Sequence, residues 1–226
     1  MIMGAWGLWR KKGWTNPYIT DGLIAMWDGI ENAGWGEHDT AATTWKNLIA
    51  NSAYPDFDIK SGGTWRDNCL QFNGFAAQSQ TAWPSFYNID LVYRLDSGYV
   101  DFAPNFGSRM RWLQWSSQEA VFSSGTNRKT YNYDFDYGNA MSLSMQYGED
   151  DIDVLYIDGV QKSQTGTKTQ RTDVPAKTCI GKREGVSSGY NTGVGVVWRI
   201  AIYSRALTAA EIAANYAIDK QRFNLP

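Results

Sequence analysis

The sequence is poor in the residues that much catalytic and metal chemistry requires. Its 226 residues include one histidine, two cysteines and 19% charged residues, against about 25% charged residues in typical soluble domains. The one histidine, His38, gives little support to His-dependent catalytic triads or His-rich metal sites. The net charge of −2 provides no basic field to attract phosphates, so no nucleic-acid partner is expected.

Disulfide, membrane and secretion signals are also missing. Cys69 and Cys179 are too few for a disulfide framework, and they either pair or stay as buried thiols. No apolar run approaches the roughly 18 residues of a membrane span, so no such span is expected. The start, MIMGAWGLWRKKGW, places its charges after its apolar residues, which is unlike a signal peptide.

What the chain does contain is a series of short strand patterns separated by turn signals. Leu23, Ala25 and Trp27 alternate with Ile24, Met26 and Asp28, which is typical of a strand buried on at least one face. The pair Asp158-Gly159 predicts a tight type I′ hairpin turn. Near the C-terminus, VVWRIAIYS predicts a strand with Trp198, Ile200 and Ile202 on one face. The class predicted is all-β, a two-sheet antiparallel sandwich.

One short helix is expected after the last strand. Thr208 and Glu211 form a capping box, and Leu207 and Ile212 form the hydrophobic staple that accompanies it. The pattern places Ile212, Tyr216 and Phe223 on the packed side of the helix, with Glu211 and Asn215 off that side. A cap contributes only about 1 kcal/mol, so the helix must dock on the sheet.

The sequence predicts that residues 1–18 form a separate N-terminal arm. Trp6, Trp9 and Trp14 stand among glycines and basic residues. Either the arm packs on its own domain, or it docks its tryptophans into a partner or a sister subunit, because aromatic residues and Arg are enriched at interface centres.

The C-terminal segment WRIAIYSRALTAAEIAANY resembles the closing segment of concanavalin A-like, laminin G-like jelly-roll domains. DGLIAMWDG, CLQFNG, VLYIDGVQ and CIGKREG resemble other strands and hairpins of that family, in the same order. The resemblance covers roughly residues 19–220, and the sandwich is expected over 19–226. It implies a jelly roll with a binding edge made of loops, of the type found on phage or gut-bacterial surfaces.

The residues favour a protein without catalytic activity. Glycoside hydrolases with this fold carry an E-x-D-x-x-E strand motif that supplies two carboxylates, and this sequence lacks it. The nearest acidic cluster, around Asp150 and Asp151, follows a glycine and precedes a hairpin, so a solvated turn is expected. No G-x-S-x-G motif occurs.

Ligand sites are predicted in two regions. In YNYDFDY the rings from Tyr131 to Tyr137 share one strand face, which is expected to be core, and Asn132, Asp134 and Asp136 share the other, which is available to a sugar. The glycine-rich loop around Tyr190 and Asn191 is the second candidate rim. Related domains often bind calcium, for which the candidates are Asp134, Asp136, Asp150 and Asp151.

Together these features predict a non-catalytic, glycan-binding recognition module. By analogy with the family it would be displayed on a phage virion surface as a capsid decoration, head fibre or tail adhesin. Its partners would be a glycan, other virion proteins through the arm, and a second copy of the chain. The alternatives are a purely structural virion subunit that uses its arm and edges for protein contacts, and a degenerate glycoside hydrolase-like domain.

Overall fold

The computed structural model describes most of the sandwich. The described residues are 16–84, 87–98, 100–103, 111–116, 119–124, 127–132, 137–146, 154–162, 165–166, 177–181 and 193–225, and within 100–132 and 165–166 only the backbone is described. The arm tryptophans Trp6, Trp9 and Trp14 therefore lie outside the described residues.

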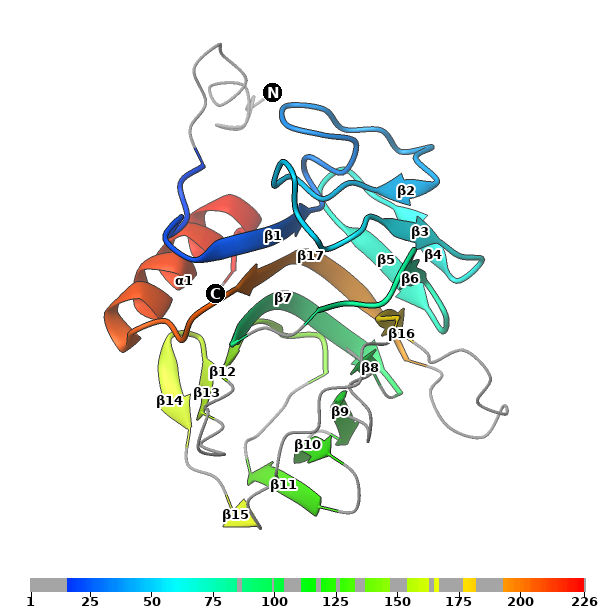
Figure 1. Cartoon of the computed structure of the whole chain (residues 1–226). Helices are drawn as coiled ribbons and strands as arrows, with labels where there is room; N and C mark the ends of the chain where they lie inside the picture. The colour runs from blue at the N-terminus through cyan, green and yellow to red at the C-terminus, as the bar shows by residue number, and fades with distance from the viewer. Residues whose placement is uncertain are drawn as a thin grey trace, which may run out of the picture.

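Two antiparallel sheets make up the fold (Figure 1). The eight-stranded sheet has the order β14-β13-β12-β7-β17-β5-β4, and β1 pairs with the part of β17 that β5 leaves open. Its strands are β1 (Leu23–Asp28), β4 (Gly63–Trp65), β5 (Leu70–Asn73), β7 (Asn88–Ser97), β12 (Ala140–Gln146), β13 (Val154–Ile157), β14 (Val160–Lys162) and β17 (Val194–Tyr203).

The second sheet has nine strands in the order β15-β11-β10-β9-β8-β16-β6-β3-β2. Its strands are β2 (Thr44–Trp45), β3 (Phe57–Ile59), β6 (Ala77–Ser79), β8 (Val100–Ala103), β9 (Arg111–Ser116), β10 (Glu119–Ser124), β11 (Asn127–Asn132), β15 (Thr165–Gly166) and β16 (Cys179–Gly181). The predicted all-β sandwich is confirmed.

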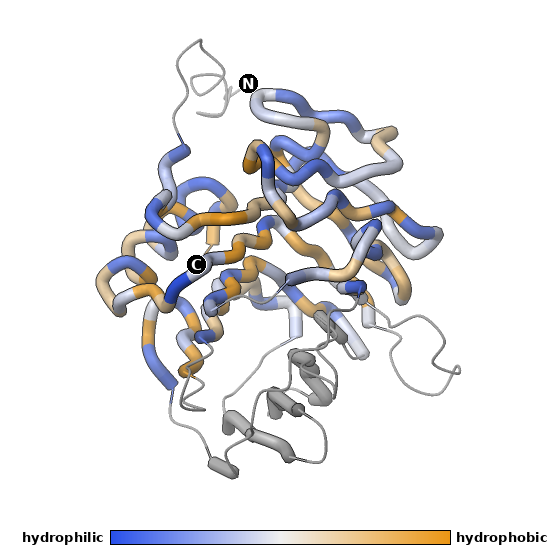
Figure 2. Tube along the Cα trace, in the orientation of Figure 1, coloured by the Kyte–Doolittle hydropathy of each residue, from blue (hydrophilic) through white to orange (hydrophobic). Residues whose placement is uncertain are grey.

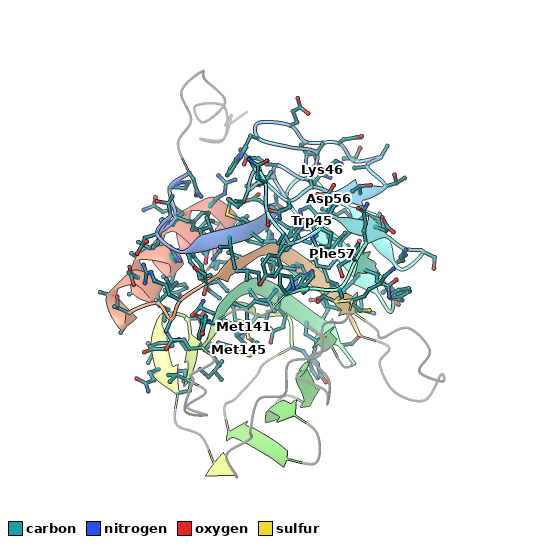
Figure 3. The ribbon with its side chains drawn as sticks, in the orientation of Figure 1. Trp45, Lys46, Asp56, Phe57, Met141 and Met145 are labelled. Carbon is teal, nitrogen blue, oxygen red and sulfur yellow. The ribbon has the colours of Figure 1, made fainter. Side chains whose placement is uncertain are left out.

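The core lies between the sheets and is rich in aromatic rings. Trp27 of β1 stacks on Trp83 with ring centroids 5.2 Å apart, and Phe57 of β3 meets Trp27 edge-on at 5.0 Å. Trp45 and Phe57 extend from neighbouring strands, as Figure 3 shows, while Lys46 and Asp56 form an ion pair beside them. Trp45 and Leu48, predicted from the sequence to lie inside, are both buried. Figure 2 shows the apolar segments gathered along β1 and β17.

Strand β17 departs from the predicted alternation. The register against β7 shifts between Val197 and Arg199, so Trp198 is an extra residue, a β-bulge. Val197, Ile200 and Ile202 face the inter-sheet core, whereas Trp198 packs in a separate cluster with Phe223. The prediction that Trp198 shares a face with Ile200 and Ile202 is therefore wrong, because the bulge reverses the alternation before Arg199.

The Asp158-Gly159 turn is confirmed by its backbone. Both residues have positive φ, 52° and 74°, as a type I′ turn requires. The turn joins β13 to β14. It lies close to the C-terminal helix, since a Cβ added at Gly159 would be 3.2 Å from the ring of Tyr216.

Helix α1 (Ala209–Phe223) follows β17 and begins with the predicted cap. The Thr208 hydroxyl accepts from the Glu211 amide, and the Glu211 carboxylate accepts from the Thr208 amide at 2.8 Å. Leu207 and Ile212 belong to one buried cluster, which confirms the staple. The helix packs against β12 and β14 on the face of the eight-stranded sheet that points away from the core, and it lies beside β1, with whose Asp28 its Arg222 pairs (Figure 1).

The buried face of α1 differs from the one predicted. Its buried residues are Ile212, Asn215, Asp219 and Phe223. Asn215 was expected to lie off the packed side, but it is 2% exposed. The helix docks through a polar stripe as well as an apolar one because the sheet beneath it carries matching polar groups.

Cys69 and Cys179 are buried thiols and no disulfide joins them, which decides between the two alternatives that the sequence left open. No helix within the described residues is long and apolar enough to cross a membrane.

The helix cap should make stability sensitive to acid. Arg205 holds the pKa of Glu211 down at about 2, so this carboxylate stabilises the fold above its ordinary pKa and stops doing so as pH falls from about 4.5 to 2. Replacing Glu211 by Gln should cost about 1 kcal/mol at pH 6, with the difference from the parent shrinking towards pH 2. Thermal unfolding of both proteins across this range checks it, and a pH-independent difference would contradict it.

Candidate functional site

We define the outer face as the face of the eight-stranded sheet that points away from the second sheet. Helix α1 divides it into a covered half, beneath the helix, and an open half, which carries the outward side chains of β4, β5 and the ends of β7 and β17. Along β7, Ile89, Leu91 and Tyr93 face the core. The alternate residues Asp90 and Arg94 therefore face outward, the first in the covered half and the second in the open half.

The covered half contains a buried ion pair. The Arg199 guanidinium donates from Nε and Nη2 to the two carboxylate oxygens of Asp219, each at 2.8 Å, and both side chains are 0% exposed. Tyr18 donates its hydroxyl to Asp219 at 3.0 Å, and its ring lies 4.2 Å from the guanidinium carbon. The Asp219 carboxylate on α1 thus connects the helix to β17, through Arg199, and to the segment before β1, through Tyr18.

Asp90 belongs to the same buried cluster. Its carboxylate accepts from the amides of Asn88 at 2.8 Å and Asn215 at 3.0 Å, and lies 3.9 Å from Arg199. Burial raises the pKa of Asp90, while Arg199 opposes that shift. Because these groups are buried and engaged with one another, the covered half is a structural network that holds the helix on the sheet.

A second ion group fixes the end of the helix. Arg222 donates to Asp28 at 3.0 Å and lies 3.6 Å from Glu31. This links α1 to the end of β1. Buried carboxylates that are paired in this way are poor candidates for general acids or bases, because their oxygens are already engaged by the arginines and no ligand can reach them.

The open half is polar and accessible. The strand registers align Ala140, Arg94, Val196, Gln71 and Thr64 in one row across β12, β7, β17, β5 and β4. The side chains of Arg94 and Asp96 are 36% and 34% exposed. Thr64 and Arg66 are exposed as well, and Gln71 is half-buried.

An apolar floor lies under this polar layer. Val196, Trp198 and Cys69 are buried together with Phe223 at the end of the helix. The Arg94 guanidinium lies 5.9 Å from the Trp198 ring centroid. Burial raises the pKa of the Cys69 thiol to about 11, so the thiol stays protonated and unreactive.

The guanidinium groups of Arg94 and Arg66 have different hydrogen-bond partners, a carboxylate for the first and a neutral amide for the second. Arg94 donates to both carboxylate oxygens of Asp96, at 2.6 and 3.1 Å. Arg66 donates its Nε to the neutral amide oxygen of Gln71 at 2.8 Å. The open half thus presents a neutralised arginine and, beside it, an arginine hydrogen-bonded to a neutral partner.

Loops at one end of the sandwich adjoin the open half. Tyr137 lies in a turn, is 42% exposed and donates its hydroxyl to the Gly98 carbonyl at 3.0 Å. The expectation that its ring is core is wrong, because the chain has left strand β11 before it reaches Tyr137. Gly193 accepts from the Gly74 amide at 3.0 Å. Val194 pairs with Ser97, next to Gly98, so these loop boundaries lie at the same end.

The predicted ligand residues fall almost wholly outside the described residues. Asn132 ends β11 opposite Glu119 in the second sheet, and its side chain is not described. Outside the described residues lie Asp134, Asp136, Asp150, Asp151, Tyr190 and Asn191. Of the residues that adjoin these segments in the chain, Tyr137 and Gly193 are described, and both lie at the same end of the sandwich. The described part of the chain contains no group of three or more His, Cys, Asp or Glu side chains suited to a metal.

The sequence interpretation missed the open half. One signal was available, since NIDLVYRLDS alternates between apolar and polar residues and so predicts an outward row containing Asp90, Arg94 and Asp96. Nothing in the local pattern indicates that Gln71 and Arg66 lie across β17 from that row.

Comparisons with known proteins give the fold. No protein-family model and no curated protein matches the sequence. Trypanosoma rangeli sialidase in complex with 2,3-difluorosialic acid, a covalent intermediate, is similar to 94% of this chain, with a TM-score of 0.65 and 13% identity. The receptor-binding domain of botulinum neurotoxin D is similar to 88% of it, with a TM-score of 0.61 and 11% identity.

The chain spans only part of each of these proteins, 35% of the sialidase and 53% of the toxin domain. At such identities the likeness concerns the fold, and it agrees with the β-sandwich predicted from the sequence. The finer laminin G-like and phage assignments stay predictions.

Proposed function

We propose that this chain is a non-catalytic recognition module that binds glycans on the open half of the outer face and the adjoining loop end. The observation that carries the proposal is the division of one sheet face by α1. The covered half is sealed, whereas the open half keeps Arg94, Asp96 and Gln71 partly exposed above a buried Trp198. A few fixed polar groups above an apolar floor are typical of small-ligand sites.

The chemistry of the open half suits sugar hydroxyls. A carboxylate accepts, a guanidinium donates, and an amide does both, so the set can satisfy vicinal hydroxyls. The Arg94–Asp96 pair and the Arg66–Gln71 hydrogen bond hold these groups in place before any ligand arrives, which lowers the entropic cost of binding. The similar structures lend support, since one is a sialidase solved in complex with sialic acid and another a toxin receptor-binding domain.

The absence of catalysis is part of the proposal. Hydrolysis of a glycoside commonly needs two carboxyl groups on either side of the bond, one of which carries a proton. In the open half, as defined by its described residues, Asp96 is paired with Arg94. The buried acids of the covered half are engaged with Arg199 and Arg222.

Display on a virion surface, as a decoration, head fibre or tail adhesin, also belongs to the proposal. It rests on the sequence resemblance alone. In that setting the N-terminal arm would dock the module through Trp6, Trp9 and Trp14 on other virion proteins or on a second copy, while Tyr18 at its end stays buried against Asp219 of the same chain.

A glycan array tests the proposal. The purified chain should retain at least one class of printed glycan. Replacing Gln71 by Ala should weaken binding about tenfold, because one or two hydrogen bonds to the sugar are lost. Gln80, an exposed glutamine at the end of β6 on the other sheet, provides the matched control as Gln80→Ala.

Two results would count against the proposal. Retention of no glycan would overturn glycan binding, and release of sugar from a bound glycan would revive the hydrolase alternative. Loss of binding in Asn132→Ala and Asp134→Asn, with Gln71→Ala unaffected, would move the site from the open half to the loop rim.

A further inference from the structure

Arg66 provides the open half with a charge that an acid does not neutralise. Among the described residues no carboxylate forms an ion pair with it, and its partner is the neutral Gln71 amide. Arg94, across the same face, is already neutralised by Asp96 at 2.6 Å. Asp67, the next residue along the chain, is exposed on the same side but forms no ion pair with Arg66 among the described residues, so the β4–β5 side offers a guanidinium that no carboxylate occupies.

The Gln71 contact also orients the guanidinium. Because Nε donates to the Gln71 oxygen at 2.8 Å, the two terminal nitrogens are left as a free pair of donors on the opposite edge of the group. That edge is planar and matches the two oxygens of a carboxylate, which it can bind through parallel hydrogen bonds. Arg66 is exposed, so a ligand can reach this edge.

The spacing of Arg94 and Gln71 across the sheet suits a sugar. Arg94 and Gln71 occupy one row with Val196 between them, so their strands are about 10 Å apart. Cys69, just before β5, is buried in the same apolar cluster as Val196 and Trp198 and so forms part of the floor between β5 and β7. One or two sugar rings can lie over this floor with an acidic group at the Arg66 side.

We propose that the open half recognises a saccharide that carries a carboxylate, with the Arg66 guanidinium receiving the carboxylate and Gln71, Thr64 and the Arg94–Asp96 pair contacting its hydroxyls. This inference rests on the proposed function and names the class of glycan. Arg66 acts as the specificity-determining residue, because it supplies the charge, unpaired among the described residues, that distinguishes a carboxylate from a neutral substituent.

The test uses the full chain on an array of matched neutral, carboxylated and sulfated glycans, followed by titration of the best carboxylated glycan and its methyl ester. We expect the ester and the neutral counterpart to bind at least tenfold more weakly. Arg66→Gln should lower the affinity for the acid about 10- to 100-fold, the effect of losing a charged hydrogen-bond pair. Arg66→Lys should lie between, because a lysine keeps the charge without the planar pair of donors.

Lys46→Gln is the matched control, since Lys46 is an exposed cation on the other sheet and the substitution changes net charge equally. It should bind like the parent, and Arg66→Gln should unfold thermally like the parent. Equal affinity for acid and ester, an unchanged Arg66→Gln variant, or equal binding of sulfated glycans would overturn the carboxylate assignment while glycan binding stands. Retention of no glycan would overturn both.

Discussion

Replacing Asp219 by alanine should destabilise the protein by about 3–5 kcal/mol, because it leaves the Arg199 charge buried without its counter-ion. Asp219 accepts two hydrogen bonds from Arg199 and one each from Tyr18 and Ser142. Each of these donors lies in the buried layer between α1 and the sheet, where water cannot easily replace the lost acceptor. Urea unfolding followed by tryptophan fluorescence measures the loss.

Two further variants separate the loss of a buried ion pair from the loss of any ion pair. Lys46→Ala breaks an exposed ion pair with Asp56 and should cost less than about 1 kcal/mol. The double variant Arg199→Met, Asp219→Leu removes the ion pair as a whole and should recover part of the stability lost by Asp219→Ala, since apolar groups of similar volume need no counter-ion. The recovery is partial because Asp90 loses Arg199 as its nearby cation. If the single variant cost no more than Lys46→Ala, the network would not be what holds α1 on the sheet.

Replacing Gly181 by alanine should destabilise the protein by about 2–5 kcal/mol. Gly181 ends β16 with φ +88°, and an added Cβ would lie 2.0 Å from the Gly74 carbonyl oxygen. The left-handed backbone costs about 1–2 kcal/mol for an L-residue, and forcing backbone apart in a packed region costs about 1–3 kcal/mol more. Thermal and urea unfolding of the variant provide the measurement.

Gly74→Ala separates the two causes. Gly74 also has a positive φ, +75°, but an added Cβ there meets nothing within 4 Å. Its substitution should therefore cost only the backbone part, about 1–2 kcal/mol. Equal losses in the two variants would show that the close approach of β16 to Gly74 does not contribute.

The sequence predicts correctly those features that depend on a few neighbouring residues. The capping box of Thr208 and Glu211 and the positive-φ pair Asp158-Gly159 depend on contacts within a few residues, so their predictions are confirmed. The alternation in β1 likewise predicts that Ala25 and Trp27 face the core. Such features depend on backbone preferences and on the period of two of a strand.

The predictions that failed involve contacts between distant segments. Trp198 faces the helix because a bulge in β17 is set by its pairing with β7, which the sequence of β17 alone does not indicate. Asn215 and Asp219 are buried because Asp90 and Arg199 lie opposite them. A polar residue on a helix normally faces water unless a buried polar partner meets it. Here the partners lie on β7 and β17, far from the helix in the sequence.

By itself the sequence determined the class of fold, the run of short strands, the hairpin turn and the capped terminal helix, since each follows from local periodicity and turn chemistry. Only the tertiary structure decided which half of the outer face is sealed and which stays open. That division depends on where α1 docks and on which strands flank β17, so it brings Arg66, Gln71 and Arg94 together from separate parts of the chain. The physical reason is that a local pattern fixes the side of a strand on which a residue lies, whereas pairing between distant strands fixes its neighbours.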